Sequence, residues 1–365
     1  MTLRKNLELL REKKMRGEKL AKEEINCIVK DVVDRTLGEI EITAFITAQQ
    51  HHGMNMDEIE ALTRAMVDHG STIDFQRPVF DKHSLGGIPG NKVTLLIVPI
   101  VAAAGLLIPK TSSKAITSPA GTADTMSTLA PVDFSASELK AIATKVNGAI
   151  IWGGSLNLAP ADDIFIGVEY PLQIDPEPQM LASIMAKKLA VGTDYLVLDL
   201  PVGREAKVET FEQARSISNQ LIDLGERLGV RAKCGITYGG QPVGYSVGPA
   251  LEAKEALLAL EGRGPTSLVE KSTALAGLLF ELAGKASKGR GQAIAKELLT
   301  SGKALKKMHE IIEAQGGNPK VGPDDIPIGE KKAEIAAPCD GYITRVSNKA
   351  ITAIARAAGA PVEKG

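Results

Sequence analysis

The sequence predicts an α/β protein that combines an all-helical lobe with an α/β lobe built around a mainly parallel sheet. Two patterns along the 365 residues lead to this prediction. Apolar residues recur at helical spacing from residue 3 to about 69, and short apolar runs alternate with helical patterns from residue 75 onward. The composition agrees, because 44% hydrophobic residues with only 4% aromatic residues leave Ala, Val, Leu and Ile to fill the core.

The N-terminal pattern divides into four helices, because glycines stand where each helix should stop: Gly17, Gly38, Gly53 and Gly70. Residues 1–70 therefore form a predicted helical domain, which residues from about 160 to 193 are expected to complete. Its helices carry more apolar surface than a small lobe can bury alone, which predicts a homodimer or a larger homo-oligomer. The residues behind this prediction are Ile25, Ile28, Val32, Ile42 and Ile46.

The middle of the chain alternates between strand-like and helix-like segments. The runs 150–152 and 195–200 are short, apolar and bounded by Gly or Pro, which is typical of buried parallel strands. A helix is expected after the first loop, with a buried face formed by Val93, Leu96, Ile97 and Ile100. Residues 71–159 and 194–318 accordingly form the predicted α/β domain. Residues 319–332 are rich in Pro and Asp and predict a linker, and residues 333–365, strand-like and then helical, predict a partial C-terminal domain.

Charge and cysteine content exclude several classes of protein. A net charge of −1 gives no reason to expect nucleic acid or a membrane surface as a partner. Cys27, Cys234 and Cys339 lie far apart without a CxxC pair, so neither a disulfide framework nor a metal site is predicted. The N-terminus lacks an apolar signal core, and the apolar run 95–109 is shorter than the ~20 residues of a membrane-spanning helix. We therefore expect a cytoplasmic protein.

Two donor-rich loops flank the apolar run 95–109. The first, 81–94, contains Gly86, Gly87 and Gly90, which allow a ligand to approach the backbone closely. Its donors are Lys82, Ser84 and Thr94. A further lysine donor is expected to be either Lys92 of the same loop or Lys114 of the second loop. The second loop holds seven hydroxyl residues and two lysines between residues 110 and 125. Together the loops predict a phosphate site; the alternative for the first is an ordinary strand-to-helix turn, since it lacks the Walker spacing.

The residues of these loops resemble a known family. Lys82-His83-Ser84-x-Gly86-Gly87, followed by Ser112-Ser113-Lys114 and Gly121-Thr122-x-Asp124, is similar to the thymidine and pyrimidine nucleoside phosphorylases. Within that family the likeness is to the archaeal-type AMP phosphorylases, and it extends over nearly the whole chain. The resemblance implies the fold of the class II nucleoside phosphorylases. It also implies that an N-terminal extension and the end of the C-terminal domain are absent.

The resemblance assigns roles to the residues of both loops. It implies phosphate contacts for Lys82, Ser84, Thr94, Ser112 and Thr122. It implies substrate contacts for Gly87, Ser113, Lys114, Ala115, Ile116, Thr117 and Ser118. The alternative for Thr94 and Thr122 is that they cap helices. His83 stands between two predicted phosphate ligands in an extended segment, so it would face the sugar or base and serve proton transfer, unless it is a structural histidine.

A third segment, 174–188, is implied to contact the base. Ser183 and Lys187 are four residues apart, share one helix face and match family positions that contact the base. Asp175 is the candidate proton donor to N7 of a purine, provided that base and sugar bury it enough to raise its pKa. The alternative is that Asp175 caps the helix.

Two positions depart from the nucleoside phosphorylases. Val168 stands where thymidine phosphorylases have an arginine for a pyrimidine carbonyl, which puts pyrimidine nucleosides in doubt. Arg204 and Lys207 lie where those enzymes have a small, uncharged stretch. The added positive charge suits a substrate that carries a second phosphate, whereas an ordinary solvated loop is the alternative.

The resemblance therefore implies a pentosyltransferase that catalyses reversible phosphorolysis of AMP, or of CMP or UMP, to free base and ribose 1,5-bisphosphate. Inorganic phosphate is then a co-substrate, and no cofactor is expected. The alternatives are a pyrimidine nucleoside phosphorylase, a non-catalytic nucleotide sensor, and a phosphoribosyltransferase of related fold. The last would need a metal-binding acidic pair, for which Asp162 and Asp163 are the candidates.

Overall fold

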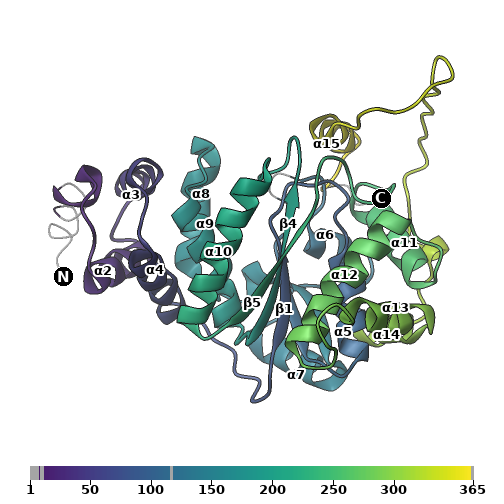
Figure 1. Ribbon diagram of the computed structural model, residues 1–365, viewed down its shortest axis with the longest axis horizontal. Coiled ribbons are helices and arrows are strands. Elements are labelled where there is room, and N and C mark those ends of the chain that lie inside the picture. The colour runs from purple at the N-terminus through teal and green to yellow at the C-terminus, as the bar shows by residue number, and fades with distance from the viewer. Residues whose placement is uncertain (1–7, 9–11, 116–117, 363–365) are drawn as a thin grey trace. The chain divides into compact units, whose positions relative to one another are not determined.

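The computed structural model describes residues 8, 12–115 and 118–362. The chain folds into two compact units (Figure 1). The first consists of Met1–Gln76, Leu156–Asp194 and Asn219–Ala232. The second consists of Arg77–Ser155, Tyr195–Ser218 and Lys233–Gly365. Helices dominate the first unit and parallel strands run through the second, which confirms the predicted combination of a helical and an α/β lobe.

The helical unit is built from η1 (Lys14–Arg16), α2 (Lys22–Val33), α3 (Glu39–His52), α4 (Met56–Asp68), α8 (Pro160–Leu172) and α9 (Glu177–Ala190). Helices α2, α3 and α4 begin with the same contact. A glutamate at the third helical position accepts the backbone N–H of the residue before the helix, at 2.8 to 3.0 Å; the glutamates are Glu24, Glu41 and Glu58. This contact satisfies an N–H group that the helix itself leaves without a partner, so local sequence sets where these helices start.

The apolar residues of α2 and α3 are buried inside the chain itself. Ile25, Ile28 and Ile46 are each 0% exposed, and Val32 and Ile42 are 1% and 3% exposed. They form part of this chain's own core, because α4 and α8 pack against α2. These side chains therefore do not offer apolar surface to a second copy, contrary to the expectation from the sequence. The homo-oligomer itself stays a prediction.

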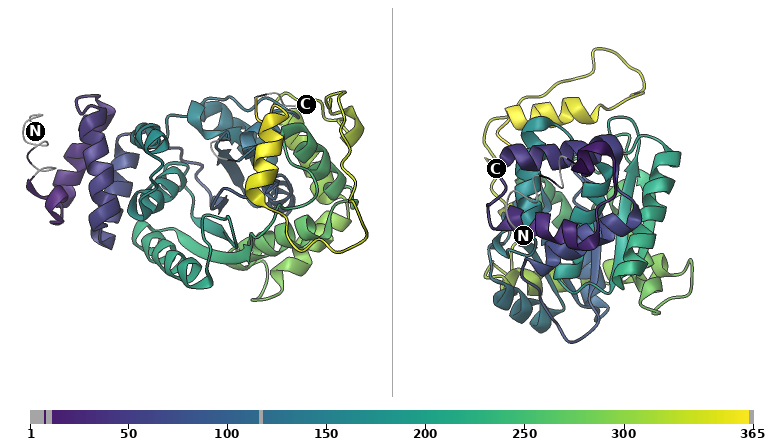
Figure 2. Two further views of the ribbon diagram at one scale, coloured as in Figure 1. Left: turned by 90° about the horizontal axis from the view of Figure 1, so that it is seen from above. Right: turned by 90° about the vertical axis from the view of Figure 1, so that its left-hand side faces the viewer.

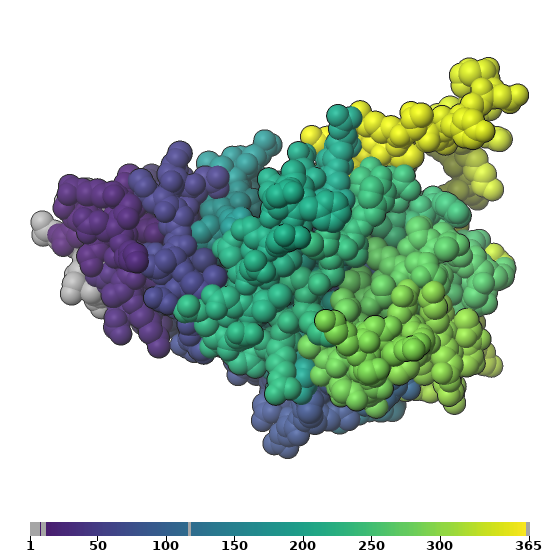
Figure 3. Space-filling view, viewed as in Figure 1, coloured from purple at the N-terminus to yellow at the C-terminus, as the bar shows by residue number. Residues whose placement is uncertain are grey.

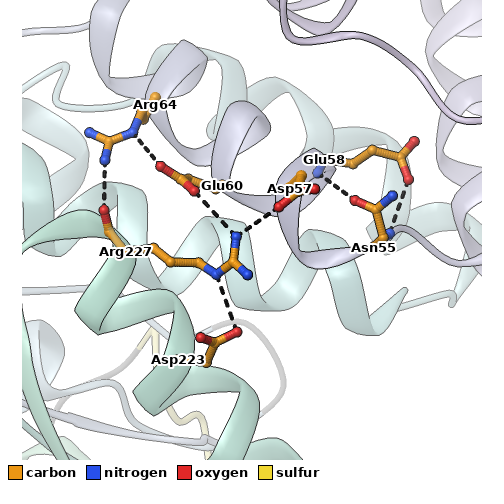
Figure 4. A network of polar contacts seen from close by, with 7 residues as sticks. All are labelled: Asn55, Asp57, Glu58, Glu60, Arg64, Asp223 and Arg227. Carbon is orange, nitrogen blue, oxygen red and sulfur yellow. Dashed lines mark hydrogen bonds and ion pairs between the residues drawn. The ribbon is translucent and has the colours of Figure 1, made fainter.

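An arginine near the end of α10 (Phe211–Leu228) joins that helix to α4 (Figure 4). Arg227 Nη1 lies 2.8 Å from Asp57 Oδ1 and 3.6 Å from Glu60 Oε2. Arg64 Nη2 donates to the backbone carbonyl of Arg227 at 2.8 Å. These groups are partly exposed, so the contacts orient the two helices more than they stabilise the fold.

The strands of the α/β unit are β1 (Phe80–Ser84), β2 (Ile108–Ser112), β3 (Gly148–Trp152), β4 (Tyr195–Val202) and β5 (Arg231–Tyr238). β4 lies between β1 and β5 and runs parallel to β1, and β2 pairs in parallel with β3. A parallel bridge between Val79 and Leu107 joins the two sheets. The buried parallel strands predicted at 150–152 and 195–200 are therefore confirmed.

The remaining helices of this unit are α5 (Thr94–Ala103), α6 (Thr122–Met126), α7 (Ala136–Val146), α11 (Pro249–Leu260), α12 (Thr266–Leu282), α13 (Gly291–Thr300), α14 (Lys303–Ala314) and α15 (Asn348–Ala357). α5 lies at the centre of the core, because every residue from 94 to 102 is buried. Strands β2 and β3 contact it, and so do α12 and α14. The predicted buried face of this helix is therefore confirmed, and its other faces are buried as well.

Two parts of the C-terminal region differ from their predictions: residues 333–347, which were expected to be strand-like, and the predicted linker 319–332. Residues 333–347 form no strand in the described structure, and residues 333–345 are exposed before α15 begins. This segment, yellow in Figures 2 and 3, runs over the outside of the α/β unit. A strand needs a hydrogen-bonded neighbour, so alternation of residue types alone does not make one. Within the predicted linker, Val321 and Ile326 are buried in the core of the unit.

Length and apolar character together decide whether a helix can cross a membrane. Within residues 8, 12–115 and 118–362, no helix has enough of both.

Lys14 and Glu58 form a buried ion pair in the helical unit. Their side chains are 2% and 4% exposed, and Lys14 Nζ lies 3.1 Å from Glu58 Oε1. Lys14 also donates to the Gly53 carbonyl at 2.8 Å, and Glu58 accepts the Leu20 N–H at 3.0 Å. The pair therefore ties the segment before α2 and the loop after α3 to the first turn of α4.

We expect Lys14→Met to destabilise the helical unit by about 3–5 kcal/mol, because it leaves the buried Glu58 carboxylate without a countercharge. Lys30→Met is the matched control, since the Lys30–Asp34 pair lies one helical turn apart on the surface and should contribute little. Hydrogen exchange of peptides covering α2 to α4 measures the difference. Exchange in Lys14→Met as slow as in the wild type would contradict the prediction.

Candidate functional site

Three loops follow the carboxyl ends of strands in the α/β unit. Residues 85–93 follow β1, residues 113–121 follow β2 and residues 203–210 follow β4. β1 is parallel to β4, and the parallel bridge between Val79 and Leu107 places β2 on its other side. The three loops therefore leave the sheet at the same edge. Ligands of α/β proteins bind at this edge, outside the carboxyl ends of the strands.

β1 carries the predicted phosphate ligands Lys82 and Ser84. Side chains alternate along a strand, so these two residues share one face of β1 and His83 lies on the other. Lys82 is 2% exposed, and its Nζ lies 3.4 Å from the hydroxyl of Thr94, the first residue of α5. The structure therefore brings Lys82 and Thr94 together, although they are separated by the glycine loop.

Ser84 is held by an aspartate that sequence reasoning did not single out. Ser84 Oγ donates to Asp199 Oδ2 at 2.6 Å, and Thr237 Oγ1 donates to Oδ1 at 2.5 Å. Lys271 Nζ lies 3.1 Å from Asp199 Oδ2, and the aspartate side chain is 0% exposed. Burial alone would raise the pKa of Asp199, but Lys271, Lys82 and the two hydroxyl donors outweigh it and lower the pKa. Asp199 is therefore a buried anion surrounded by cations and donors.

The sequence did contain a signal for Asp199, a single charge inside the apolar run 195–200. A charge in the middle of a buried strand needs a partner, because burying it alone is costly. The identity of the partner was not readable, since it depends on the register that places Ser84 opposite Asp199.

Asp124 closes the loop after β2. Its Oδ2 accepts the N–H groups of Ala115 at 2.6 Å and Gly121 at 2.9 Å. Glycine is required at position 121, because a Cβ there would lie 2.6 Å from the carbonyl oxygen of Ser113. The carboxylate and the close approach together fold this segment into a tight loop.

The predicted ligands of the second loop lie at its two ends. Ser112 is the last residue of β2 and Thr122 the first of α6, so the closed loop holds both near its base. Ser118 donates its hydroxyl to the Ala120 carbonyl at 2.9 Å, within the loop. Two predicted substrate contacts lie outside the described residues: Ile116 and Thr117.

Lys114 lies over an aromatic ring. Its Nζ is 3.7 Å from the centre of the Trp152 ring and 3.9 Å from Asp133 Oδ1. Trp152 is paired in register with Ser112, so the ring stands beside the second loop. A cation over an indole face is stabilised by the ring, which gives Lys114 a defined resting position next to the predicted substrate residues.

Neither threonine in these loops caps a helix. Thr94 and Thr122 are the first residues of α5 and α6, and the capping positions before them are occupied by Val93 and Gly121. Neither helix start receives a side-chain hydrogen bond from its capping residue. The capping alternative for both threonines is therefore wrong.

The loop after β4 lies against the first loop. A Cβ built on Gly87 would lie 3.9 Å from Lys207 Cγ, and Gly87 has φ of 97°, a conformation that favours glycine. The side chain of Lys207 therefore starts beside the predicted phosphate loop. Lys207 and Arg204 are both exposed at this edge.

Of the two lysines offered as alternative donors, Lys92 and Lys114, Lys92 does not face this edge. Its side chain is 0% exposed, and Nζ donates to the Val243 and Ser246 carbonyls at 3.0 and 2.9 Å and to the Glu255 carboxylate. These contacts use all three ammonium hydrogens and tie the end of the first loop to α11. Burial raises the pKa of the neighbouring Glu252 to about 7.

Ser183 and Lys187 lie four residues apart on α9 in the helical unit, on one face as predicted. Lys187 Nζ lies 2.5 Å from Asp162 Oδ2, and the Asp162 side chain is 0% exposed. Burial disfavours the lysine charge, but Asp162, together with Asp163 and Glu169, outweighs this effect and raises the pKa of Lys187. Asp162 is therefore the counterion of Lys187.

Asp175 is exposed. The capping position of α9 is Pro176, so Asp175 lies one residue before the position that the capping alternative gives it. Burial of this carboxyl has to come from a bound substrate, as its proposed donor role assumes.

The chemistry of the sheet edge suits an anion. Backbone N–H groups, hydroxyl groups and lysine ammonium groups are donors, and they bind phosphate oxygens with charge assistance. In the part of the chain that the structure describes, no group of three or more His, Cys, Asp or Glu side chains is placed to hold a metal ion.

Family models match both units of this chain. The helical bundle domain of a glycosyl transferase family matches residues 9–70, and the α/β domain of a glycosyl transferase family matches residues 76–305. These matches agree with the helical and α/β units of the structure.

Curated relatives extend the likeness over almost the whole chain. The AMP phosphorylase of Thermococcus kodakarensis is 58% identical over 355 residues, which cover 97% of this chain and 71% of the relative. The AMP phosphorylase of Methanosarcina barkeri is 56% identical over 356 residues, which cover 97% of this chain and 70% of the relative. The chain therefore spans about 70% of the length of these relatives.

A solved structure supports the fold. Anthranilate phosphoribosyltransferase from Thermus thermophilus superposes with a TM-score of 0.70 at 21% identity, over 84% of this chain and 99% of that one. At this identity the likeness shows the fold alone. Family models and relatives carry the assignment further: the chain belongs to the glycosyl transferase family, in the nucleoside phosphorylase group, and its sequence is of the archaeal AMP phosphorylase type.

Proposed function

We propose that this protein catalyses the reversible phosphorolysis of AMP to adenine and ribose 1,5-bisphosphate, with inorganic phosphate as co-substrate. The observation that carries the proposal is the presence of two cations at one sheet edge, Lys82 on β1 and Lys207 against Gly87. One cation serves the attacking phosphate and the other the 5′-phosphate. Relatives named AMP phosphorylase at 56% and 58% identity support this reading. CMP and UMP are further proposed substrates.

The attacking phosphate is proposed to bind Lys82, Ser84 and Thr94 from the first loop and Ser112 and Thr122 from the second. Each charge-assisted hydrogen bond contributes about 1.5–3 kcal/mol. Donors fixed in place before phosphate arrives also reduce the entropy lost in bringing it to C1 of the ribose. The bound anion then stabilises the positive charge that develops on the sugar as the base departs.

Asp199 accepts a hydrogen bond from Ser84, one of the proposed phosphate donors. Its counterion Lys271 allows a phosphate anion to bind near this carboxylate. Lys271 lies 3.1 Å from Asp199 Oδ2 and neutralises the carboxylate. Ser84 has one hydroxyl proton and donates it to Asp199. To donate to phosphate the hydroxyl turns away, and Lys271 and Thr237 continue to stabilise the carboxylate.

For the base, we propose contacts from Ser183 and Lys187 and proton donation to N7 of a purine by Asp175. His83 is proposed to serve the sugar or base, from the face of β1 opposite Lys82. The charge of Lys187 is maintained by Asp162, so it offers the base a cationic donor.

Two observations weigh against the alternative functions. Val168 is 9% exposed on α8, and residues 159–188 contain no arginine, so this stretch lacks the arginine contact of thymidine phosphorylases to a pyrimidine carbonyl. Asp162, half of the acidic pair that a phosphoribosyltransferase would need, pairs with Lys187.

Incubation with AMP should release adenine only when inorganic phosphate is present, because phosphate is the proposed nucleophile. Chromatography of free base, with and without phosphate, measures this. Adenosine, CMP, UMP and thymidine in parallel report the preference for the 5′-phosphate and for the base. Thymidine turned over faster than AMP would favour the pyrimidine nucleoside phosphorylase, and no release from any of them would overturn the proposal.

Asp199→Asn should lower kcat/KM for phosphate by tenfold or more, because it breaks the buried pair with Lys271 that fixes this part of the edge and removes the carboxylate that orients the Ser84 hydroxyl. Breaking a buried ion pair costs about 3–5 kcal/mol, part of which appears as lost stability. Thr237→Val removes one charge-assisted hydrogen bond to the same carboxylate, worth about 1.5–3 kcal/mol, but leaves the Asp199–Lys271 pair intact, and serves as the matched control. Wild-type phosphate kinetics in a folded Asp199→Asn protein would contradict the assigned role.

Lys207→Ala should lower kcat/KM for AMP by about two orders of magnitude and leave the weaker activity on adenosine almost unchanged. Removing one member of such a charge pair costs about 2–5 kcal/mol, and each ~1.4 kcal/mol is a factor of ten. Steady-state kinetics with both substrates measure the two losses. Equal losses would mean that Lys207 supports the fold or the shared phosphate site, and the 5′-phosphate assignment would have to be abandoned.

A further inference from the structure

The loop that carries Lys207 is a tight turn with a strained residue in it. Its ends are joined by a bridge between Val202 and Val208, and the Ala206 N–H donates to the Gly203 carbonyl at 3.1 Å. Glu205 has φ of 66°, a left-handed conformation that is unfavourable for a residue with a side chain. Surrounding contacts must hold a residue in this conformation.

Those contacts come from a segment about 140 residues later in the chain, at the start of α15 (Figure 1). Ser347 Oγ donates to Glu205 Oε2 at 2.8 Å, and the Lys349 N–H donates to the same oxygen at 3.0 Å. Arg345 Nη2 donates to Oε1. We call Arg345, Ser347, Asn348 and the Lys349 N–H the C-terminal clamp. Three of its members converge on one carboxylate two residues before Lys207.

Asn348 fixes the clamp to a second loop of the same edge. Its Nδ2 donates to the Gly239 carbonyl at 2.9 Å, and the residue is 2% exposed. The Gly239 N–H in turn donates to the Val202 carbonyl at 2.8 Å. The backbone approach is close, since a Cβ on Gly203 would lie 2.4 Å from the Gly240 nitrogen. The clamp is therefore hydrogen-bonded both to the loop after β5, through Gly239, and to the loop after β4, through Glu205.

The clamp also sets the charge near Lys207. The Lys349 N–H, the Ser347 hydroxyl and Arg345 together lower the pKa of Glu205 from 4.5 to about 2. Glu205 is therefore an anion above pH 4.5, and its contacts with the clamp are lost only as the pH falls toward 2. Arg345 neutralises this anion, which would otherwise repel a phosphate group bound by Lys207.

We propose that the C-terminal clamp, acting through Glu205, positions the Lys207 loop for the 5′-phosphate of a nucleoside monophosphate. This inference rests on the proposed function. Glu205 is a positioning residue, because it acts through Lys207 and not on the substrate. The preference for nucleotides over nucleosides is thereby determined partly by residues 345–349, far along the chain from both phosphate loops.

Glu205→Ala tests the proposal directly. Alanine has a Cβ and so meets similar backbone strain at this left-handed position, which means that the substitution removes mainly the clamp contacts. KM for AMP should rise about tenfold with kcat little changed, and kcat/KM for adenosine should stay within about twofold, because only the contact to the 5′-phosphate is displaced.

A double-mutant cycle separates positioning from a general structural role. In the Lys207→Ala background, Glu205→Ala should cause no further loss on AMP, since the group that it positions is already absent. Arg345→Ala and Ser347→Ala remove the donors to Glu205 instead of Glu205 itself, and both should reproduce the rise in KM for AMP. Asp324→Ala is the matched control, because this exposed carboxylate pairs with Lys254 on α11 in the same C-terminal part.

The outcomes distinguish the inference from the function on which it rests. Failure of the wild type to act on AMP would overturn the proposed function and this inference with it. If the wild type acts on AMP and Lys207→Ala loses AMP activity selectively, wild-type kinetics in Glu205→Ala and in the Arg345 and Ser347 variants would overturn the clamp alone. Equal losses on AMP and adenosine, or additive losses with Lys207→Ala, would also overturn it. Selective, non-additive losses would support it.

Discussion

Parallel pairing of β1 with β4, with β2 on the other side of β1, is the constraint on which the candidate site depends. It sends three loops off the same edge of the sheet and places Ser84 opposite Asp199. Antiparallel pairing would have put the β1 and β4 loops at opposite edges, and the donors of the two loops would not have met. Parallel pairing also demands long crossover connections, and the buried helix α5 is one of them.

Two buried charges around this edge are matched by a charge of opposite sign from a different part of the chain. Asp199 on β4 has Lys271 from α12, and Lys92 at the end of the first loop has Glu255 from α11. An unpaired charge at such depth would be costly, so each pair links the elements that supply it. The loops around the phosphate site are therefore held in place before any ligand arrives, which is what an electrostatic site requires.

Glu205, at the same sheet edge, is likewise a charge that is held by groups from a distant part of the chain. Its backbone is left-handed, and its carboxylate accepts hydrogen bonds from Arg345, Ser347 and the Lys349 N–H. The first loop uses glycine where its backbone is left-handed, at Gly87, and so needs no such external support there. The two neighbouring loops thus both contain a left-handed residue. The first loop uses a glycine there, whereas the loop after β4 uses Glu205, which is hydrogen-bonded to a distant segment.

The sequence by itself determined what local pattern and chemistry can specify. The spacing of apolar residues and the positions of Gly and Pro predicted the helical and α/β lobes, the strands at 150–152 and 195–200 and the two donor-rich loops. The motif in those loops identified the family. Tertiary structure alone decided that Lys92 is buried against Glu255, and that Ser84 is held by Asp199, which lies 115 positions away. The physical reason is that a hydroxyl or an ammonium group bonds whatever the fold brings within about 3 Å, and sheet register and helix packing make that choice between residues that no local pattern connects.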